Sequence, residues 1–204
     1  MKSTVRLMTH NVWNNDENHA AWEARGQDCS AEVRQEGLLR THRECMPDVI
    51  GCQELSQKMA GLLGEGLTKD PGHYAMIEGG FTSIFYRVDR LTVLESDFCR
   101  YPERVEGYEG IFNDAGSKSY CIGVFEAKES GKRFIFASTH LWWKRSPTEG
   151  MKPPYPANYQ IGSDEVRAQQ IKTLVLRIED FREKYKCPAF IVGDLNAGYD
   201  SPAV

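Results

Sequence analysis

Four apolar stretches of the chain end in polar side chains that can hold a metal ion or a phosphate. They end at Asn11, Glu54, His140 and Asp194, and Asn196 follows the last of them. These positions supply amides, carboxylates and an imidazole. Asp194 and Asn196 are two residues apart, so in an extended backbone their side chains project from the same face. We therefore expect these two side chains to contact one substrate.

The residue types fit the hydrolysis of a phosphoester, which needs a cation on the phosphate, an activated water and help for the leaving oxygen. Glu54 supplies a hard oxygen ligand suited to Mg²⁺ or Mn²⁺, and Asn11 can support that metal site. Asp194 can orient or deprotonate the attacking water. Asn196 can donate its amide to a phosphate oxygen, and His140 can stabilise the charge that develops there.

Each of these residues also has an ordinary structural explanation when it is considered alone. Asp194-Leu195-Asn196 is typical of a turn after a strand, and Glu54 beside Ser56 is typical of an acid at the start of a helix. Asn11 and His140 fit buried polar groups with satisfied hydrogen bonds. The occurrence of all the motifs in one chain favours the functional interpretation.

Several neighbours of these positions have open interpretations. His10 alternates to the other face of its strand, so we interpret it as structural. Tyr120 and Arg87 receive no role because the register of their strands is unknown. The residues after His140 can either face a phosphorylated ligand or pack under the following loop; they are Trp142, Trp143, Lys144 and Arg145.

Hydrophobic periodicity predicts helices that alternate with strands. We expect helices over about 19–45, 56–63 and 163–186. Gly26 is a possible interruption of the first helix, and Gly64 and Gly66 are expected to end the second. Asp164 and Glu165 provide the acidic first turn that favours the third.

The strand pattern predicts a sheet structure with several hairpins. We expect strands over 5–11, 48–54, 74–77, 83–87, 92–96, 120–127, 133–139 and 190–196. Residues 89–90 and 129–132 are predicted to be hairpin turns, and 141–162 a long connection of the kind that is often functional. Mixed helices and strands with hairpins predict a layered α/β sandwich instead of a purely parallel sheet.

Length and composition indicate a globular protein. With 204 residues and 41% hydrophobic content, residues 1–204 are most simply a single domain. No apolar run approaches the ~18 residues of a membrane span, and the N-terminus lacks a signal pattern. We therefore expect a cytoplasmic protein, although removal of a signal peptide from a secreted protein would leave no trace.

Charge and cysteine content narrow the classes of partner. Lys+Arg total 25 against 29 Asp+Glu, a net charge of −4, and there is no basic stripe of the kind that duplex binding requires. A phosphorylated small molecule or a nucleotide is therefore favoured as substrate, and extended nucleic acid is possible but less favoured. The six cysteines lack a CxxC spacing, so we expect reduced packing residues.

Four motifs together resemble those of the endonuclease/exonuclease/phosphatase superfamily, whose fold is DNase I-like. They are THN (Thr9 to Asn11), QE (Gln53-Glu54), STHL (Ser138 to Leu141) and GDLN (Gly193 to Asn196). The resemblance covers essentially the whole chain, including "IFYRVDRL" and "DEVRAQQ". Any one motif is weak, but four in the right order and spacing are strong.

The resemblance implies a four-layer sandwich, two mixed β-sheets flanked by helices, with a Mg²⁺-dependent phosphoesterase site. It implies that Glu54 is the metal ligand with Asn11 beside it, that Asp194 activates water, and that Asn196 and His140 contact the phosphate. Members of the superfamily cleave DNA, RNA tails, sphingomyelin, inositol phosphates and nucleotide phosphates. The resemblance therefore implies a reaction class and leaves the substrate open.

The chain departs from the family pattern after GDLN. Family members continue through further strands to a late Asp and an Asp-His pair, whereas all five histidines here lie upstream: His10, His19, His42, His73 and His140. We interpret the chain as a C-terminally truncated domain missing its last strands. The competing hypothesis is a catalytically incompetent fragment or phosphate/metal-binding module. Uncovered sheet edges would favour self-association.

Overall fold

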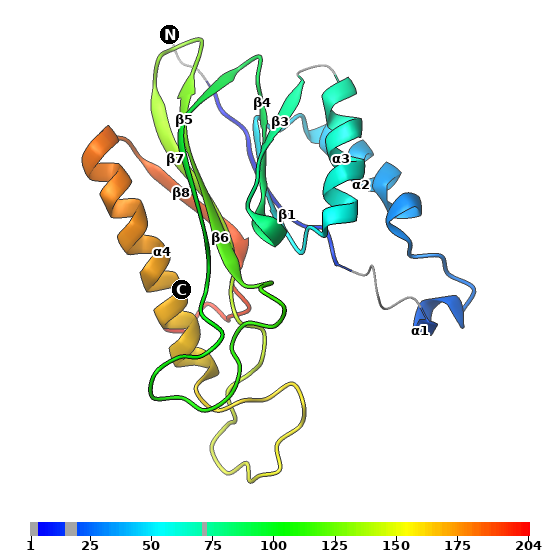
Figure 1. The fold of residues 1–204 in the computed structure, drawn as a ribbon, viewed down its shortest axis with the longest axis vertical. Coiled ribbons are helices and arrows are strands. Elements are labelled where there is room, and N and C mark those ends of the chain that lie inside the picture. The colour runs from blue at the N-terminus through cyan, green and yellow to red at the C-terminus, as the bar shows by residue number, and fades with distance from the viewer. Residues whose placement is uncertain (1–3, 15–19, 71–72) are drawn as a thin grey trace.

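Two four-stranded β-sheets stack face to face, and helices cover their outer faces (Figure 1). The computed structural model describes residues 4–14, 20–70 and 73–204. The first sheet has the order β1-β2-β4-β3, with β1 Leu7–Asn11, β2 Val49–Gln53, β4 Ile84–Arg87 and β3 Tyr74–Ile77. The second has the order β5-β6-β7-β8, with β5 Leu91–Arg100, β6 Ser119–Ala127, β7 Arg133–His140 and β8 Ala189–Asp194.

The helices are α1 Ala20–Glu23, α2 Ala31–Cys45, α3 Gln57–Lys69 and α4 Ser163–Tyr185, with a short 3₁₀ helix at Gly80–Thr82. Helices α2 and α3 cover the first sheet and α4 covers the second, as Figure 1 shows. Each sheet contains one parallel and two antiparallel pairings, so both are mixed. The predicted four-layer α/β sandwich is confirmed.

Three apolar clusters hold the four layers together. Leu39 of α2 and Leu63 of α3 pack with the first sheet, and Leu174 and Ile178 of α4 pack with the second. Between the sheets, a Cβ atom at Gly51 would lie only 2.7 Å from a methyl of Val192. A glycine in β2 therefore permits the close approach of the two sheets.

The interruption expected at Gly26 is present, whereas the end expected for the second helix is wrong. Helix α1 and helix α2 are separate, because Gly26 has a φ of 71° and Ser30 begins the second helix by accepting from the Val33 amide; His19 lies outside the described residues. Helix α3 continues through Gly64 and Gly66, which were expected to end it. A Cβ at Gly66 would lie 2.5 Å from Leu39, so this glycine lets α3 pack closely on α2. Tertiary packing thus overrides the local preference.

One predicted hairpin is also wrong. Residues 89–90 form a turn, but the turn leads from β4 in one sheet to β5 in the other, so these strands do not pair. Oδ1 of the buried Asp48 lies 3.7 Å from Arg87 Nη1 and 3.3 Å from Arg90 Nε, so its carboxylate contacts an arginine at each end of this turn. The turn over 129–132 does join the antiparallel strands β6 and β7, so the second hairpin is confirmed.

The cysteines agree in part with their expectation as reduced packing residues. All six are free, and Cys52 and Cys121 are buried, whereas Cys45 is exposed. No helix in the described part of the chain combines the length and the apolar character needed to cross a membrane. The long connection over 141–162 has only an isolated bridge between Arg145 and Tyr159.

We expect acid to destabilise the fold through His42. This side chain is 1% exposed, and burial, followed by the charge of His10 at 3.1 Å, lowers its pKa from 6.5 to about 4. Between these values the unfolded chain binds the proton more readily, so stability is complete above pH 6.5 and decreases as the pH falls toward 4. The expected loss is on the order of 2–3 kcal/mol.

Urea unfolding between pH 7 and pH 4.5 measures this dependence. His42→Gln should reduce this slope and leave the share of buried His140, whose pKa is also lowered to about 4, while His73→Gln, at an exposed histidine, should keep the wild-type slope. An unchanged slope in His42→Gln would remove His42 as the cause.

Candidate active site

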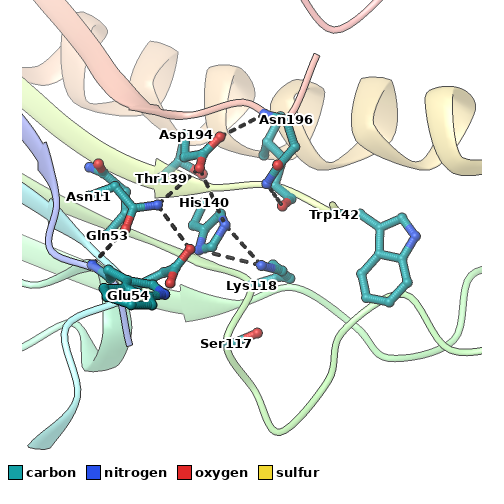
Figure 2. A network of polar contacts seen from close by, with 12 residues as sticks. Asn11, Gln53, Glu54, Ser117, Lys118, Thr139, His140, Trp142, Asp194 and Asn196 are labelled. Carbon is teal, nitrogen blue, oxygen red and sulfur yellow. Dashed lines mark hydrogen bonds and ion pairs between the residues drawn. The ribbon is translucent and has the colours of Figure 1, made fainter. Parts of the chain in front are cut away.

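Parallel pairing brings the predicted site residues together at one end of the sandwich. Strand β1 runs parallel to β2, and β7 runs parallel to β8, with His140 in register with Asp194. Each pair therefore has its carboxyl ends side by side, a hydrogen bond from Asn11 to Asp194 joins the two pairs, and Figure 2 shows Asn11, Glu54, His140 and Asp194 around one centre.

The Asn11 amide connects the two carboxylates. Its Nδ2 donates to Glu54 Oε1 at 2.9 Å and to Asp194 Oδ2 at 3.0 Å. Its Oδ1 accepts from the Trp13 backbone N–H at 2.9 Å, which fixes the orientation of the amide. Because Asn11 presents a donor to Glu54, it positions the carboxylates here, and its direct contact with a metal stays a prediction.

Glu54 is held by its backbone and by its neighbours. It follows the last residue of β2 and has a φ of 57°, a left-handed conformation that is uncommon for glutamate. Its Oε2 accepts from the Asn14 backbone N–H at 3.0 Å. The preceding Gln53 is buried and donates to Ser138 Oγ at 3.1 Å, which ties the first sheet to the second beneath the carboxylate. Unusual backbone at a polar cluster is often associated with function.

Asp194 depends on the glycine before it. A Cβ at Gly193 would lie 2.1 Å from the carbonyl oxygen of Thr139, so only glycine permits β8 to pair this closely with β7. The Asn196 backbone N–H donates to Asp194 Oδ1 at 3.0 Å. Both carboxylate oxygens of Asp194 therefore have a donor, one from Asn196 and one from Asn11.

The expected extended arrangement of Asp194 and Asn196 is wrong. Strand β8 ends at Asp194, and Asn196 has a φ of 50°. The Asp194 carboxylate accepts from the Asn196 backbone N–H, which forms a turn in place of extended backbone. The Asn196 Nδ2 group donates to the Leu141 carbonyl at 3.0 Å, which leaves one N–H of the same amide for another acceptor.

His140 contacts a buried lysine that the sequence did not indicate. Lys118 Nζ lies 2.9 Å from His140 Nε2, and both side chains are almost fully buried. Burial, followed by the positive charge of Lys118, lowers the pKa of His140 from 6.5 to about 4. Burial also lowers the pKa of Lys118, whereas Asp114, Glu54 and Asp194 act in the opposite direction. The low pKa of His140 leaves its imidazole uncharged at neutral pH, and the three carboxylates favour the charged form of Lys118.

The structure places the other residues whose roles the sequence left undecided. Tyr120 packs in the core beneath α4, and Arg87 pairs with Asp89 away from the strand ends that form the site. His10 faces His42, in agreement with its structural interpretation. Trp142 is buried, whereas Trp143 is 40% exposed and donates its indole N–H to Asp114.

A cavity of about 480 Å³ opens over these groups, within the usual range for ligand pockets. It is lined by Glu54, Lys118, His140 and Asn196, with Phe81 and Trp143 at its sides. The site is therefore accessible and has both an acidic and a basic side.

The acidic side has a donor set that fits a divalent cation. Glu54, His140 and Asp194 each offer one ligand atom, and these atoms lie within 4.8 Å of one another. His140 Nε2 lies 3.9 Å from Asp194 Oδ2. The carboxylates of Glu54, Asp194 and Asp114 outnumber the single lysine, Lys118, so their combined charge favours a bound cation. Carboxylates alone favour Mg²⁺ or Mn²⁺, and an imidazole widens the choice to transition metals.

Replacing Lys118 should change the titration of His140. In Lys118→Met the pKa of His140 is expected to rise from about 4, since a nearby positive charge is removed, and to stay below 6.5 because burial remains. NMR titration of the imidazole in metal-free protein measures the shift. Lys132→Met, in an exposed turn, is the control. A pKa unchanged by Lys118→Met would contradict the contact.

Known structures share this fold. The sequence matches no family model and no curated protein. An endonuclease/exonuclease/phosphatase family protein from Bacteroides thetaiotaomicron superimposes with a TM-score of 0.72 at 17% identity, over 98% of this chain and 65% of that one. A mannosyl-6-phosphatase from the same organism gives 0.65 at 16% identity, over 98% and 68%.

A third structure was solved with nucleic acid. D. rerio TDP2, complexed with single strand DNA product, superimposes with a TM-score of 0.60 at 19% identity, over 97% of this chain and 62% of that one. The chain thus spans about two thirds of the length of these structures (65, 68 and 62%). At these identities the similarity establishes the fold.

Proposed function

From a fold that the chain shares with endonuclease/exonuclease/phosphatase proteins, we propose a metal-dependent phosphoesterase in which water attacks the phosphorus of a phosphodiester or phosphomonoester. The observation that carries the proposal is the Asn11 amide, which joins the carboxylates of Glu54 and Asp194 beside Lys118 and His140. Such a site can hold a cation, a water and a phosphate next to one another.

In this proposal Glu54 holds the cation, with Asn11 beside it and with Mg²⁺ or Mn²⁺ as the expected ion. A bound divalent cation supplies charge neutralisation for the phosphate oxygens. Asn11 keeps the Glu54 and Asp194 oxygens at fixed positions through its two hydrogen bonds. A preorganised pair of carboxylates does not have to reorganise when the substrate arrives.

Asp194 orients the attacking water and takes its proton. Donors from Asn11 and Asn196 fix both of its oxygens, so their remaining lone pairs have defined directions. As the water oxygen bonds to phosphorus, one water proton passes to Asp194, the bond from phosphorus to the ester oxygen breaks, and that oxygen leaves with the bonding electron pair and takes a proton from solvent. His140 Nε2 lies 3.9 Å from Asp194 Oδ2, beyond hydrogen-bond distance, and its contact is with Lys118 Nζ at 2.9 Å.

Lys118 and Asn196 contact the phosphate on the basic side of the cavity. Lys118 is the positive charge there, and its contact with the neutral His140 ring holds the ammonium in place. The remaining amide N–H of Asn196 donates to a second phosphate oxygen. His140 therefore acts by hydrogen bonding and by positioning Lys118. The sequence suggested instead that His140 itself would stabilise the charge that develops on the phosphate.

The substrate is proposed to be a phosphorylated small molecule or a nucleotide. The net charge of −4 disfavours long nucleic acid. Among structures of the same fold, one is a mannosyl-6-phosphatase and another was solved with single strand DNA product, so the fold accommodates both classes.

The test is hydrolysis of bis-p-nitrophenyl phosphate and p-nitrophenyl phosphate by the whole chain, with Mg²⁺, with Mn²⁺ and with EDTA. We expect release of p-nitrophenol that requires metal, stops in EDTA and returns when metal is added again. Comparison of the two compounds separates diesterase from monoesterase activity. Metal binding without hydrolysis of either compound, or of a wider phosphoester panel, would support a binding module instead.

A further inference from the structure

A second cavity adjoins the catalytic one. It also measures about 480 Å³ and shares two lining residues with the first, Trp143 and Asn196. These two side chains therefore form a common wall between the cavities. A molecule whose phosphate contacts Asn196 can extend past this wall into the second cavity, which we name the Arg145 pocket; it is lined by Trp143, Arg145, Ser146, Asp164, Arg167 and Asn196.

The Arg145 guanidinium is available for a ligand. Its side chain is exposed and makes no ion pair or hydrogen bond with any residue that the structure describes. Five N–H donors in a planar fork match the oxygens of a phosphate. Ser146 lies beside Arg145, with Oγ accepting from the Asp164 amide at 3.0 Å and the hydroxyl hydrogen-bonded to the Asp164 carboxylate.

The backbone around Arg145 is held in place although it lies in a long loop. The Arg145 amide donates to the Asn158 carbonyl at 2.9 Å, and the Arg145 carbonyl accepts from the Gln160 amide at 2.9 Å. Arg167 of α4 donates to the carbonyl oxygens of Trp142 and Lys144 at 3.1 and 2.6 Å. A free side chain on a fixed backbone is the arrangement of a binding residue.

Charge in the pocket favours an anion. The guanidinium groups of Arg145 and Arg167 face a single carboxylate, that of Asp164, in a protein whose net charge is −4. Arg167 is 3% exposed and pairs with the Asp164 carboxylate, so the unpaired Arg145 guanidinium leaves the pocket with a net positive charge; the Arg167 Nε has no hydrogen-bond partner among the described residues. Partly desolvated positive charge raises the affinity for anions in a confined site.

We propose that the Arg145 pocket binds a second phosphate of the substrate, while the first phosphate lies in the catalytic cavity. This inference rests on the proposed function, since it assigns the first phosphate to Lys118 and Asn196. The second phosphate can belong to a small bisphosphate or to the next nucleotide of a short strand. Both sources present the same group to Arg145.

Calorimetry on metal-free protein tests the pocket without turnover. The probes are thymidine 5′-monophosphate, thymidine 3′,5′-bisphosphate and a 5′-phosphorylated thymidine dinucleotide. We expect at least one of the two probes with a second phosphate to bind about 10–100-fold more tightly than the monophosphate, as one added charge-assisted contact provides. Preference for the bisphosphate or for the dinucleotide identifies the source.

Arg145→Ala should remove most of this difference, and Lys152→Ala, an exposed cation on the same loop outside the pocket, should preserve it. Equal ratios in wild type and Arg145→Ala would overturn the proposal, as would equal binding of all three probes. Binding does not require hydrolysis, so a protein that discriminates between the probes but fails to turn over phosphoesters would refute the proposed function and keep the pocket.

Discussion

The variant Asp194→Asn is expected to lower kcat of metal-dependent phosphoester hydrolysis by about 10²–10⁴-fold, the usual contribution of a general base. The substitution keeps the size of the side chain and an oxygen for the Asn196 amide, so the turn after β8 is retained. What it removes is the basic oxygen that faces Asn11. The loss should therefore appear in kcat, with a smaller change in KM.

The control for this experiment is Asp200→Asn, which makes the same change at an exposed position six residues later. It should retain wild-type kcat. Activity of Asp194→Asn within a few-fold of wild type would exclude Asp194 as the base, and circular dichroism of both variants separates a catalytic effect from loss of the fold.

Glu54→Gln is expected to weaken the binding of Mn²⁺ by at least about 10–100-fold. Metal affinity usually falls by this factor when a residue that only hydrogen-bonds to a ligand is replaced, and the loss of a direct ligand should lower it at least as much. The amide can still accept from the Asn14 N–H, but it lacks the negative charge that attracts a cation. Titration of Mn²⁺ followed by electron paramagnetic resonance measures the affinity directly and needs no substrate.

Glu65→Gln, an exposed position on α3, provides the matched control and should bind Mn²⁺ like wild type. If Glu54→Gln binds Mn²⁺ with unchanged affinity, the ion lies elsewhere and the donor set of Glu54, His140 and Asp194 is not the metal site.

Much of the site was predictable because its residues follow apolar strands. Asn11 is the last residue of β1 and Glu54 follows β2, while His140 and Asp194 are the last residues of β7 and β8. The ends of the apolar strands therefore indicate all four positions. Lys118 was missed for a physical reason. It precedes the amino end of β6, and only the antiparallel register of Ser119 with His140 places it in the site. No local pattern marks that register.

The errors in the fold share a cause. Gly66 was expected to end a helix, but its missing side chain is what allows α3 to approach Leu39 of α2. Residues 89–90 do form a turn, yet the partner of β5 is β6, which lies later in the chain. Local sequence predicted helix content and turns, whereas the contacts that decide these two cases join distant segments.

The most direct test of the proposed chemistry is hydrolysis of bis-p-nitrophenyl phosphate in ¹⁸O-labelled water, with wild type and Asp194→Asn compared in Mn²⁺ and in EDTA. Attack of water on phosphorus predicts p-nitrophenyl phosphate carrying one solvent oxygen and unlabelled p-nitrophenol. Formation should require Mn²⁺ and fall by at least about 10²-fold in Asp194→Asn. Product that forms equally fast in EDTA, or equally fast without the Asp194 carboxylate, would contradict a metal-dependent phosphoesterase at this site.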